Sequence, residues 1–551
     1  MTSQNSVQNT ADTSWWRQAV IYQIYPRSFR DTDGNGIGDL NGIIEKIPYL
    51  ASLSIDAVWL SPFFPSALAD GGYDVDDYRD VDPKIGTLLQ FDLMVKELAK
   101  HNIKVFVDIV PNHSSNQHEW FKEALASPVG SPARDRYIFR DGKGKNGELP
   151  PNDWPSHFAP SAWTRTTNPD GTPGQWYMHL FAPEQPDFNW DNPEIHEDFK
   201  KTLRFWSDRG VAGFRIDVAH ALKKDLSEPY RSFPKIKEFD NPLTGDDVLF
   251  DRNEVHEIYR EWRKVFDEYD PPRVAVAEAY VRVERRVLYA RPDELGQAFN
   301  FDLLEADYDA KVFKELITNG ISWAEKEGSS TTWVLENHDR PRIASKYGLP
   351  KGYDYKKWLG TDGKEPICDE VLGLARAKAA MAMLFALPGC TYIYQGQELG
   401  LQEVTDIPED QIQDPQYLRN LKVFKGRDGC RVPLPWNADR PFFGFSDKAS
   451  HLPQPAWFKK YAVDVQESGE STLNLFRKII GLRRTLQTEE KYEWHETGNP
   501  GVLHFSRPNG WHCIHNFDGE PFVLPEGELI LQTAPLVGGK VGSATTVWLR
   551  R

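Results

Sequence analysis

The chain has 551 residues, of which 40% are hydrophobic and 26% are charged, and these proportions exclude a disordered or collagen-like protein. Lys and Arg total 65 against 81 Asp and Glu, so the net charge of −16 disfavours binding to nucleic acid or to an anionic membrane. A neutral partner is the better expectation, although such a charge also simply favours solubility. The length predicts one large domain with one or two smaller modules.

The N-terminal residues 1–14 are polar and predict a disordered tail. They lack the basic and apolar regions of a signal peptide, and no apolar run approaches the roughly 20 residues of a membrane span. We therefore expect a cytoplasmic protein without a membrane segment, as a monomer or homodimer. The four cysteines lie far apart without CxxC pairs, so the sequence indicates neither a zinc cluster of cysteines nor a disulfide framework.

Eight short apolar or aromatic runs predict buried parallel strands, most of them followed by a helical stretch such as 91–102. The runs are 19–25, 57–60, 104–110, 213–218, 274–279, 298–303, 331–336 and 391–395. Eight units of this kind predict a closed (β/α)₈ TIM barrel. A doubly wound open sheet is the alternative, but it would normally carry a glycine-rich phosphate loop after its first strand, and the first run has none.

Two segments interrupt this rhythm. Residues 114–185 are rich in Gly, Pro, Trp and Asn and predict a domain inserted after the third strand. After the amphipathic stretch 472–486, short strand-like runs with Gly and Pro turns predict a C-terminal antiparallel β-sandwich over 488–551. The barrel is then expected to comprise residues 15–113 and 186–487.

The loop DTDGNGIGD (31–39), after the first strand, has the oxygen-rich pattern of a hard-cation site. Its candidate ligands are the side chains of Asp31, Asp33, Asn35 and Asp39 and the carbonyl oxygen of Ile37. It is not an EF-hand, because the twelfth position is Gly42 rather than Glu. We expect structural Ca²⁺ or Mg²⁺; the alternative is an Asx-rich turn without metal.

Polar side chains follow the third, fourth, fifth and seventh predicted strands. They are Asp108, Asn112 and His113, then Arg215, Asp217 and His220, then Glu278, and finally Glu336, Asn337, His338 and Asp339. The carboxyl ends of barrel strands face the active site. Three buried carboxylates at one mouth require either a metal or a reaction that develops positive charge, and glycosidic cleavage is such a reaction.

Each of these residues also has a structural explanation. Asp108 is expected to hold neighbouring groups by hydrogen bonds rather than to react. Arg215 points to the same strand face as Asp217 and could be only its salt-bridge partner, which would itself keep Asp217 ionised. His113 and His338 lack HxH or HExxH spacing, so donors to sugar hydroxyls explain them better than zinc ligands do.

The motifs DIVPNH, QPDFN, GFRIDVAH, NHD and GQELG follow one another in an order that resembles glycoside hydrolase family 13, the α-amylase family. The resemblance covers nearly the whole chain and is closest to the oligo-1,6-glucosidase and α-glucosidase branch. It implies Asp217 as nucleophile, Glu278 as general acid/base and Asp339 as the third carboxylate of a double displacement. It also places His113, Arg215 and His338 around the −1 sugar, and implies Ca²⁺ at the 31–39 loop.

The resemblance further implies a pocket that accepts one terminal glucose. Asp74 and Arg431 match the pair that closes this pocket, Tyr73 is expected to stack on the sugar, and Phe188 to line the entrance. A loop salt bridge and simple aromatic packing are the alternatives. The expected substrates are small neutral α-1,4-linked sugars such as maltose, with sucrose and α-1,6-linked sugars as alternatives. Transglucosylation, including sucrose isomerase or trehalose-forming activity, is the alternative reaction.

Overall fold

The computed structural model describes residues 13–158, 160–419 and 424–551, so residues 1–12 of the expected tail lie outside the described part. Eight parallel strands form a closed barrel in the order β1-β11-β10-β9-β8-β7-β3-β2, and the predicted TIM barrel is confirmed. The strands are β1 (Val20–Ile24), β2 (Ala57–Leu60), β3 (Lys104–Ile109), β7 (Gly213–Ile216), β8 (Val274–Ala277), β9 (Gly296–Asn300), β10 (Thr332–Trp333) and β11 (Cys390–Tyr394).

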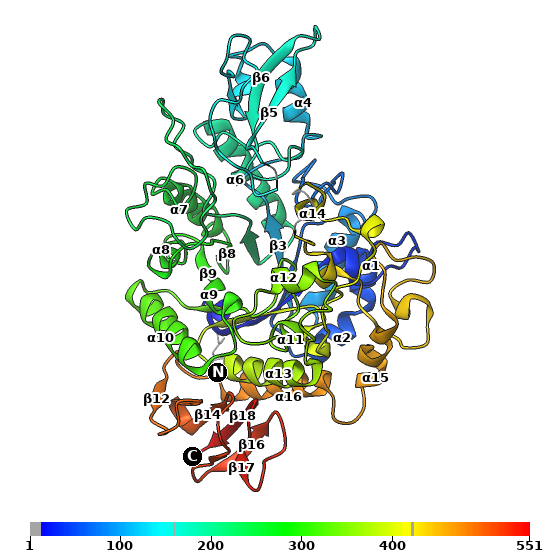
Figure 1. Cartoon of the computed structure of the whole chain (residues 1–551), viewed down its shortest axis with the longest axis vertical. Coiled ribbons are helices and arrows are strands. Elements are labelled where there is room, and N and C mark those ends of the chain that lie inside the picture. Colours follow the sequence, from blue (N-terminus) through cyan, green and yellow to red (C-terminus); the bar gives the residue numbers. More distant parts are fainter. Residues whose placement is uncertain (1–12, 159, 420–423) are drawn as a thin grey trace, which may run out of the picture.

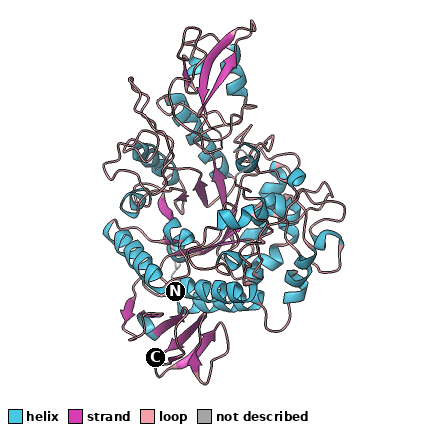
Figure 2. Ribbon diagram, in the orientation of Figure 1, coloured by secondary structure: helices cyan, strands magenta, loops and turns pink. Residues whose placement is uncertain are grey.

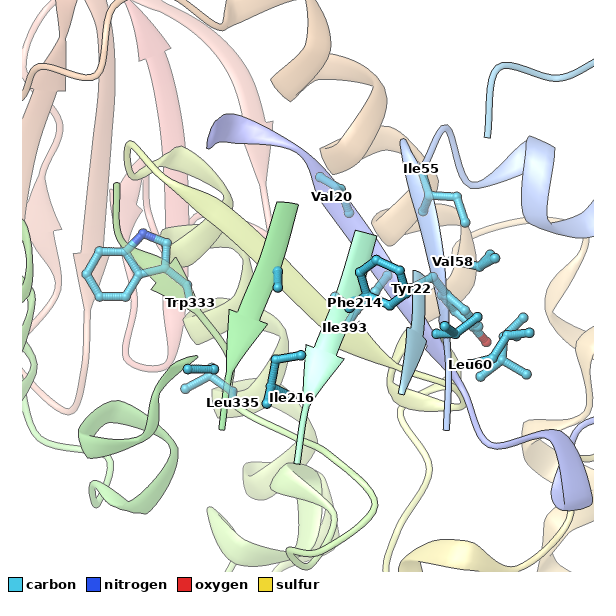
Figure 3. Packing of buried hydrophobic residues seen from close by; sticks show 14 of the residues in the cluster. Val20, Tyr22, Ile55, Val58, Leu60, Phe214, Ile216, Trp333, Leu335 and Ile393 are labelled. Atoms are coloured by element: carbon cyan, nitrogen blue, oxygen red, sulfur yellow. The ribbon is translucent and has the colours of Figure 1, made fainter. Parts of the chain in front are cut away.

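The barrel strands read as continuous apolar runs because both of their faces are buried. Along β1, Val20 and Tyr22 belong to the large cluster between strands and helices, whereas Ile21 belongs to the cluster inside the barrel. Figure 3 shows Val20 and Tyr22 among the buried residues of the large cluster. Inside the barrel, the ring of Trp59 lies 5.7 Å from that of Phe299, so this volume is packed with side chains.

Helices surround the barrel and follow most of its strands (Figure 1). Those up to β11 are α1 (Leu40–Glu45), α2 (Ile47–Ser52), α3 (Leu88–Ala99), α6 (Pro193–Asp208), α7 (Val255–Phe266), α8 (Val283–Tyr289), α9 (Phe301–Glu305), α10 (Ala310–Lys326), α11 (Ile343–Lys346), α12 (Tyr355–Gly360) and α13 (Glu370–Ala386). Their starts follow local chemistry: the Asn192 side chain accepts from the Glu194 amide, and Pro193 opens α6. Of the helices described, none is long and apolar enough to cross a membrane.

Between β3 and β7 the chain forms a small unit at one end of the molecule (Figure 1). Its elements are α4 (Glu119–Ala126), α5 (Pro132–Asp135), β4 (Phe139–Arg140), β5 (Trp163–Thr167) and β6 (Pro173–Met178). The three strands pair as an antiparallel sheet in the order β4-β6-β5. This unit lies within the segment that was predicted to be inserted after the third strand.

A five-stranded antiparallel sheet lies at the opposite end, in the order β12-β13-β14-β18-β16 (Figure 2). Its strands, with the separate pair β15 and β17, are β12 (Glu493–His495), β13 (Val502–Arg507), β14 (Trp511–Asn516), β15 (Phe522–Val523), β16 (Glu528–Gln532), β17 (Lys540–Val541) and β18 (Thr545–Arg550). They follow α14 (Pro415–Arg419), α15 (Val463–Gln466) and α16 (Thr472–Leu486). One face packs on α13, where Trp548 Nε1 donates to the Ala382 carbonyl at 3.0 Å.

Several barrel strands end before their apolar runs do. The run 298–303 predicts a strand, but β9 ends at Asn300 and α9 begins at Phe301, and β10 differs most from its run. The sequence predicts a strand over 331–336, but β10 covers only Thr332–Trp333. Beyond it, Glu336 turns to bind the Arg342 guanidinium at 2.6 Å and the Ile343 amide at 3.2 Å. Leaving this buried carboxylate without donors would cost more free energy than losing the last ladder hydrogen bonds of the strand. The strand therefore ends early.

Candidate active site

A cavity lies at the carboxyl ends of the barrel strands, and Asp217, Glu278 and Asp339 all line it. Asp217 directly follows β7, Glu278 directly follows β8, and Asp339 lies in the loop after β10. The three carboxylates are nearly buried, with exposures of 5% for both Asp217 and Glu278. The fold therefore brings together the carboxylates that the sequence placed at strand ends.

Arg215 lies beneath the cavity and joins three acidic side chains. Its NH1 nitrogen lies 2.6 Å from Oδ1 of Asp217 and 2.9 Å from Oδ1 of Asp108. Its NH2 nitrogen lies 2.8 Å from Oε2 of Glu278. Because one guanidinium bridges Asp217 and Glu278, these two carboxylates are held close together on the cavity wall.

The acidic cluster around Arg215 resists full ionisation. Burial raises the pKa of Asp217 above its ordinary range, against the opposing charge of Arg215, and raises the pKa of Asp108 to about 7. Three carboxylates facing one guanidinium would leave excess buried negative charge if all were ionised. The cluster therefore retains a proton near neutral pH, and that proton belongs to the group rather than to one member.

The backbone next to Asp217 is strained and contributes a donor. Val218 has a φ of 44°, in the left-handed region that a β-branched residue rarely adopts. In this conformation its amide donates to Oε2 of Glu278 at 3.0 Å. Such strain persists only where the surrounding contacts determine the conformation, and here it links the two carboxylate-bearing loops.

Asp339 differs from the other two carboxylates because two arginines contact it. Its Oδ1 lies 2.7 Å from Arg431 NH2 and 3.1 Å from Arg427 NH1. Burial alone would raise its pKa, but the guanidinium groups of Arg427 and Arg431 outweigh burial and hold the pKa of Asp339 well below its usual range. Asp339 is therefore an anion at neutral pH.

Tyr73 lines the cavity beside Asp339 and contacts His338, which is not among the described residues that line the cavity. The Tyr73 hydroxyl lies 2.6 Å from Nε2 of His338 and donates to Oδ2 of Asp108 at 3.1 Å. The two rings stack at 5.4 Å between centroids. Tyr73 lines the cavity, and burial lowers the pKa of His338 well below its usual value, so this imidazole is neutral.

His113 and His220 present neutral imidazoles to the cavity. Burial lowers the pKa of each to about 3. Nε2 of His113 lies 3.0 Å from Nε2 of Gln185, which brings the QPDFN motif to the site. Within the described residues, the buried Nδ1 of His220 has no hydrogen-bond partner.

The expected ion pair between Asp74 and Arg431 is wrong. Asp74 is completely buried and accepts hydrogen bonds from the Ala69 and Asp70 amides at 2.9 and 3.0 Å, while Arg431 pairs with Asp339. The pair at the cavity wall joins Asp70 Oδ1 to Arg427 NH2 at 2.7 Å, and both residues line the cavity. Asp74 holds the loop that presents Asp70, and its burial without a cation explains why it cannot close the pocket.

Phe188 does not line the cavity either. Its ring is buried and stacks on Tyr137 at 5.1 Å, so the structural alternative of simple packing is correct for this residue. The aromatic lining comes instead from Phe158, Phe181, Phe250 and Tyr280, beside Tyr73. Apart from the Tyr that follows Glu278, these residues lie in irregular loops without a motif, and the sequence offered no signal for them.

The alpha-amylase catalytic-domain model matches residues 23–490. The chain belongs to the α-amylase family. A trehalose-6-phosphate hydrolase of Bacillus subtilis is 33% identical over 94% of this chain and 92% of its own length. An oligo-1,6-glucosidase of Parageobacillus thermoglucosidasius is 35% identical over 85% of this chain and 84% of its own length. The solved structure of an isomaltulose synthase from Klebsiella sp. LX3 superposes with a TM-score of 0.82 and 29% identity, over 97% of this chain and 99% of that one.

These matches confirm the predicted α-glucosidase branch of the α-amylase family, and the chain is a glycoside hydrolase of that type. The names of the relatives span hydrolases and, among solved structures, sugar isomerases. Family membership therefore establishes the reaction class. The glycosidic bond that is cleaved and the acceptor of the glucosyl group have to be argued from the cavity.

The loop expected to bind metal brings three carboxylates together. Asp31, Asp33 and Asp39 each offer an oxygen within 4.8 Å of the others, and Asp31 and Asp39 are buried. Burial raises the pKa of Asp39, and Asp31 adds repulsion. Backbone amides supply part of the compensation: Asp31 accepts from Gly34 at 2.7 Å, and Asp39 accepts from Gly42 at 2.7 Å as the cap of α1.

Proposed function

We propose that this α-amylase family enzyme is a retaining, exo-acting α-glucosidase that removes single terminal glucosyl units from short neutral oligosaccharides. The observation that carries the proposal is the bridging of Asp217 and Glu278 by one guanidinium at the cavity wall. Retaining glycosidases keep their two carboxyl groups about 5–5.5 Å apart, whereas inverting enzymes need a wider gap for water. Two carboxylates on one Arg215 fit the closer arrangement.

In the proposed reaction Asp217 attacks C1 of the glucosyl unit while Glu278 protonates the glycosidic oxygen, which breaks the C1–O bond. The reaction requires an anion on Asp217 and a proton on Glu278. Arg215, 2.6 Å from Oδ1 of Asp217, would stabilise that anion. Water deprotonated by Glu278 then releases α-glucose and restores both groups.

Asp339 would bind hydroxyl groups of the −1 sugar as an anion. Sugar hydroxyls donate strongly to a carboxylate, and the charge also stabilises the oxocarbenium-like transition state. His113 lines the cavity and is neutral through burial, so it would add a hydrogen bond without adding positive charge that opposes this state. His338, bound through Nε2 to Tyr73 and through Nδ1 to Gln23, would instead hold Tyr73 in place.

The exo action follows from the closed end of the cavity. Arg427 NH2 binds Asp70 from the loop after β2, Arg427 NH1 binds Asp339 from the loop after β10, and Arg427 Nε binds Asp414 at 2.8 Å. This network joins loops across the barrel mouth and leaves no path for a polymer to run through that side. The hydroxyl groups of a single terminal glucose would donate hydrogen bonds to the carboxylates of this network.

The opposite side of the cavity would hold the leaving group. Arg340 lies there, but Glu305 binds its Nε, Glu238 lies 3.9 Å from its NH2, and its guanidinium lies 5.2 Å from the Tyr280 ring centre. Because these carboxylates already compensate Arg340, this cation favours a neutral sugar over a phosphorylated one. Lys237 also lines the cavity without an ion pair among those of the described residues, so trehalose 6-phosphate belongs in the test. We expect maltose-type α-1,4 substrates, with sucrose and α-1,6 bonds as the alternatives.

The test is a substrate panel of maltose, isomaltose, sucrose, trehalose, trehalose 6-phosphate, maltotriose and starch. The proposal requires release of glucose from short sugars and no activity on starch. A preference for trehalose 6-phosphate would contradict the neutral leaving-group side. Disaccharides that accumulate at high sugar concentration, in place of free glucose, would favour the transglucosylase or isomerase alternative.

We also propose that the 31–39 loop binds structural Ca²⁺, or Mg²⁺. The donor set fits a hard cation, because three carboxylates converge there and the salt bridges found among the described residues include none to them. Asp31, Asp33, Asn35, Asp39 and the Ile37 carbonyl would hold the ion. A cytoplasmic location and a monomeric or homodimeric state stay predictions, which cell fractionation and light scattering would test.

A further inference from the structure

Three histidines lie together on the outer face of the C-terminal sheet. His495 ends β12 and pairs directly with His504 on β13, while His512 on β14 pairs with Ser506, two residues further along β13. Residues two apart on a strand share a face, so all three imidazoles project from the same side. On β18, Trp548 faces α13, whereas Leu549, the partner of His512, belongs to the opposite face.

The imidazoles converge closely enough to share an ion. One ring nitrogen from each histidine lies within 4.8 Å of the other two. Ring centres are separated by 4.5 Å between His495 and His504, 5.3 Å between His495 and His512, and 5.2 Å between His504 and His512. Nε2 of His504 and Nδ1 of His512 are already 2.9 Å apart.

Ordinary structural roles do not account for this convergence. The 2.9 Å contact between His504 and His512 and the 2.7 Å contact between His495 and Ser506 each satisfy single ring nitrogens, but they do not require the three rings to converge. Histidines that gather to carry protons need anions, and the ion pairs of the described residues include none to these three.

We propose that His495, His504 and His512 form a binding site for a divalent transition metal that prefers imidazole, zinc foremost. Zinc–nitrogen bonds of about 2.0–2.1 Å require ligand nitrogens roughly 3.4 Å apart in a tetrahedron, which small side-chain rotations would provide here. Water would fill the fourth position. Ser506 Oγ lies 2.7 Å from Nε2 of His495 and would fix the orientation of that ring.

The site is separate from the proposed chemistry. The described residues that line the catalytic cavity include none from the C-terminal sheet. The role that fits is structural: the ion would tie β12, at the edge of the sheet, to β13 and β14. Oxygen ligands make the 31–39 loop a calcium-type site, whereas an all-imidazole set favours zinc, copper, nickel or cobalt.

The experiment uses tag-free protein that has been treated with chelator and then saturated with Ca²⁺, so that the 31–39 loop does not take up the probe. Zinc alone is titrated by calorimetry, with the bound metal counted by mass spectrometry, and Co²⁺ replaces it for absorption spectroscopy. We expect one zinc per chain, a visible cobalt spectrum typical of four-coordinate nitrogen ligation, and a higher melting temperature with zinc.

His495→Gln, which removes the half-buried ligand, is expected to weaken zinc binding at least about tenfold and to abolish the cobalt spectrum. His504→Gln gives a second, buried variant, and His101→Gln, at an exposed position, is the matched control. Glucosidase activity of His495→Gln should equal that of the unmodified enzyme. Zinc binding of equal strength in His495→Gln and His101→Gln, or no binding at submillimolar zinc, would overturn the proposal.

Discussion

Replacing Asp70 with Asn tests the ion pair that closes the cavity. The substitution keeps the shape of the side chain and removes its negative charge. Asp70 lies 2.7 Å from Arg427, and the side chains are only 5% and 9% exposed, so solvent compensates little for the loss. Arg427 would keep Asp339 and Asp414 as partners, and the fold should survive.

The expected loss follows from one charged hydrogen bond to the terminal glucose. Hydrogen bonds to charged groups contribute about 1.5–3 kcal/mol. Since about 1.36 kcal/mol corresponds to a factor of ten in rate, kcat/KM for maltose should fall roughly 10- to 150-fold. The melting temperature should change little by comparison.

Initial rates on maltose and on p-nitrophenyl α-glucoside measure this effect, and Asp74→Asn is the matched control. Asp74 accepts from the Asp70 amide on Oδ1 and from the Ala69 amide on Oδ2, so an Asn keeps one of these two bonds. Because Asp74 is not among the described residues that line the cavity, its loss of kcat/KM should be smaller than that of Asp70→Asn. If Asp70→Asn kept full kcat/KM while Asp74→Asn lost it, the assignment of the closing pair to Asp70 and Arg427 would be refuted.

Three further predictions follow. Glu278→Gln should lower kcat on maltose about 10²- to 10⁴-fold but affect a glucosyl fluoride far less, because fluoride leaves without an acid; equal losses on both would count against Glu278 as the acid. EDTA should lower the melting temperature of the unmodified enzyme and Ca²⁺ should restore it, whereas neither should change the melting temperature of Asp33→Asn. If EDTA left the melting temperature of the unmodified enzyme unchanged, a structural ion in the 31–39 loop would be excluded. Burial raises the pKa of Glu403 from 4.5 to about 8, so the folded state keeps a proton that the unfolded chain releases, and stability is lost as pH rises through that window. As the pH rises from 4.5 to 8, Glu403→Gln should therefore become more stable relative to the unmodified enzyme, which a higher melting temperature would show. The difference in unfolding free energy should grow by at most ~5 kcal/mol, and a difference that is constant with pH would contradict this.

The barrel could be predicted because its strands are buried on both faces. Continuous apolar runs such as 213–218 and 274–279 contain β7 and β8, and the acidic residues Asp217 and Glu278 directly after these strands mark the mouth. The limit of β10 could not be read from its run, because the side-chain bonds of Glu336 end the strand, and these depend on the distant Arg342.

The site was predicted where chemistry is tied to a strand end and missed where it depends on pairing across loops. Asp217, Glu278 and Asp339 come together as expected. The partner of Arg427 could not be found from the sequence, because Asp70 and Asp74 lie four residues apart in one acidic loop and only the folded loop decides which carboxylate faces the arginine.

The three histidines of the C-terminal sheet illustrate the same limit. His495, His504 and His512 are spaced nine and eight residues apart, which matches no metal motif. Antiparallel pairing of β12, β13 and β14 brings them to one face. The cluster depends on the register of these strands, which cannot be read from the sequence.

The most direct test of the central claim is to trap the glucosyl-enzyme with a fluorinated α-glucosyl fluoride and to map the labelled peptide by mass spectrometry. A retaining mechanism with Asp217 as nucleophile predicts one glucosyl adduct on Asp217, and magnetic resonance should show α-glucose as the first product from maltose. An adduct on another carboxylate, or β-glucose as the first product, would contradict the account.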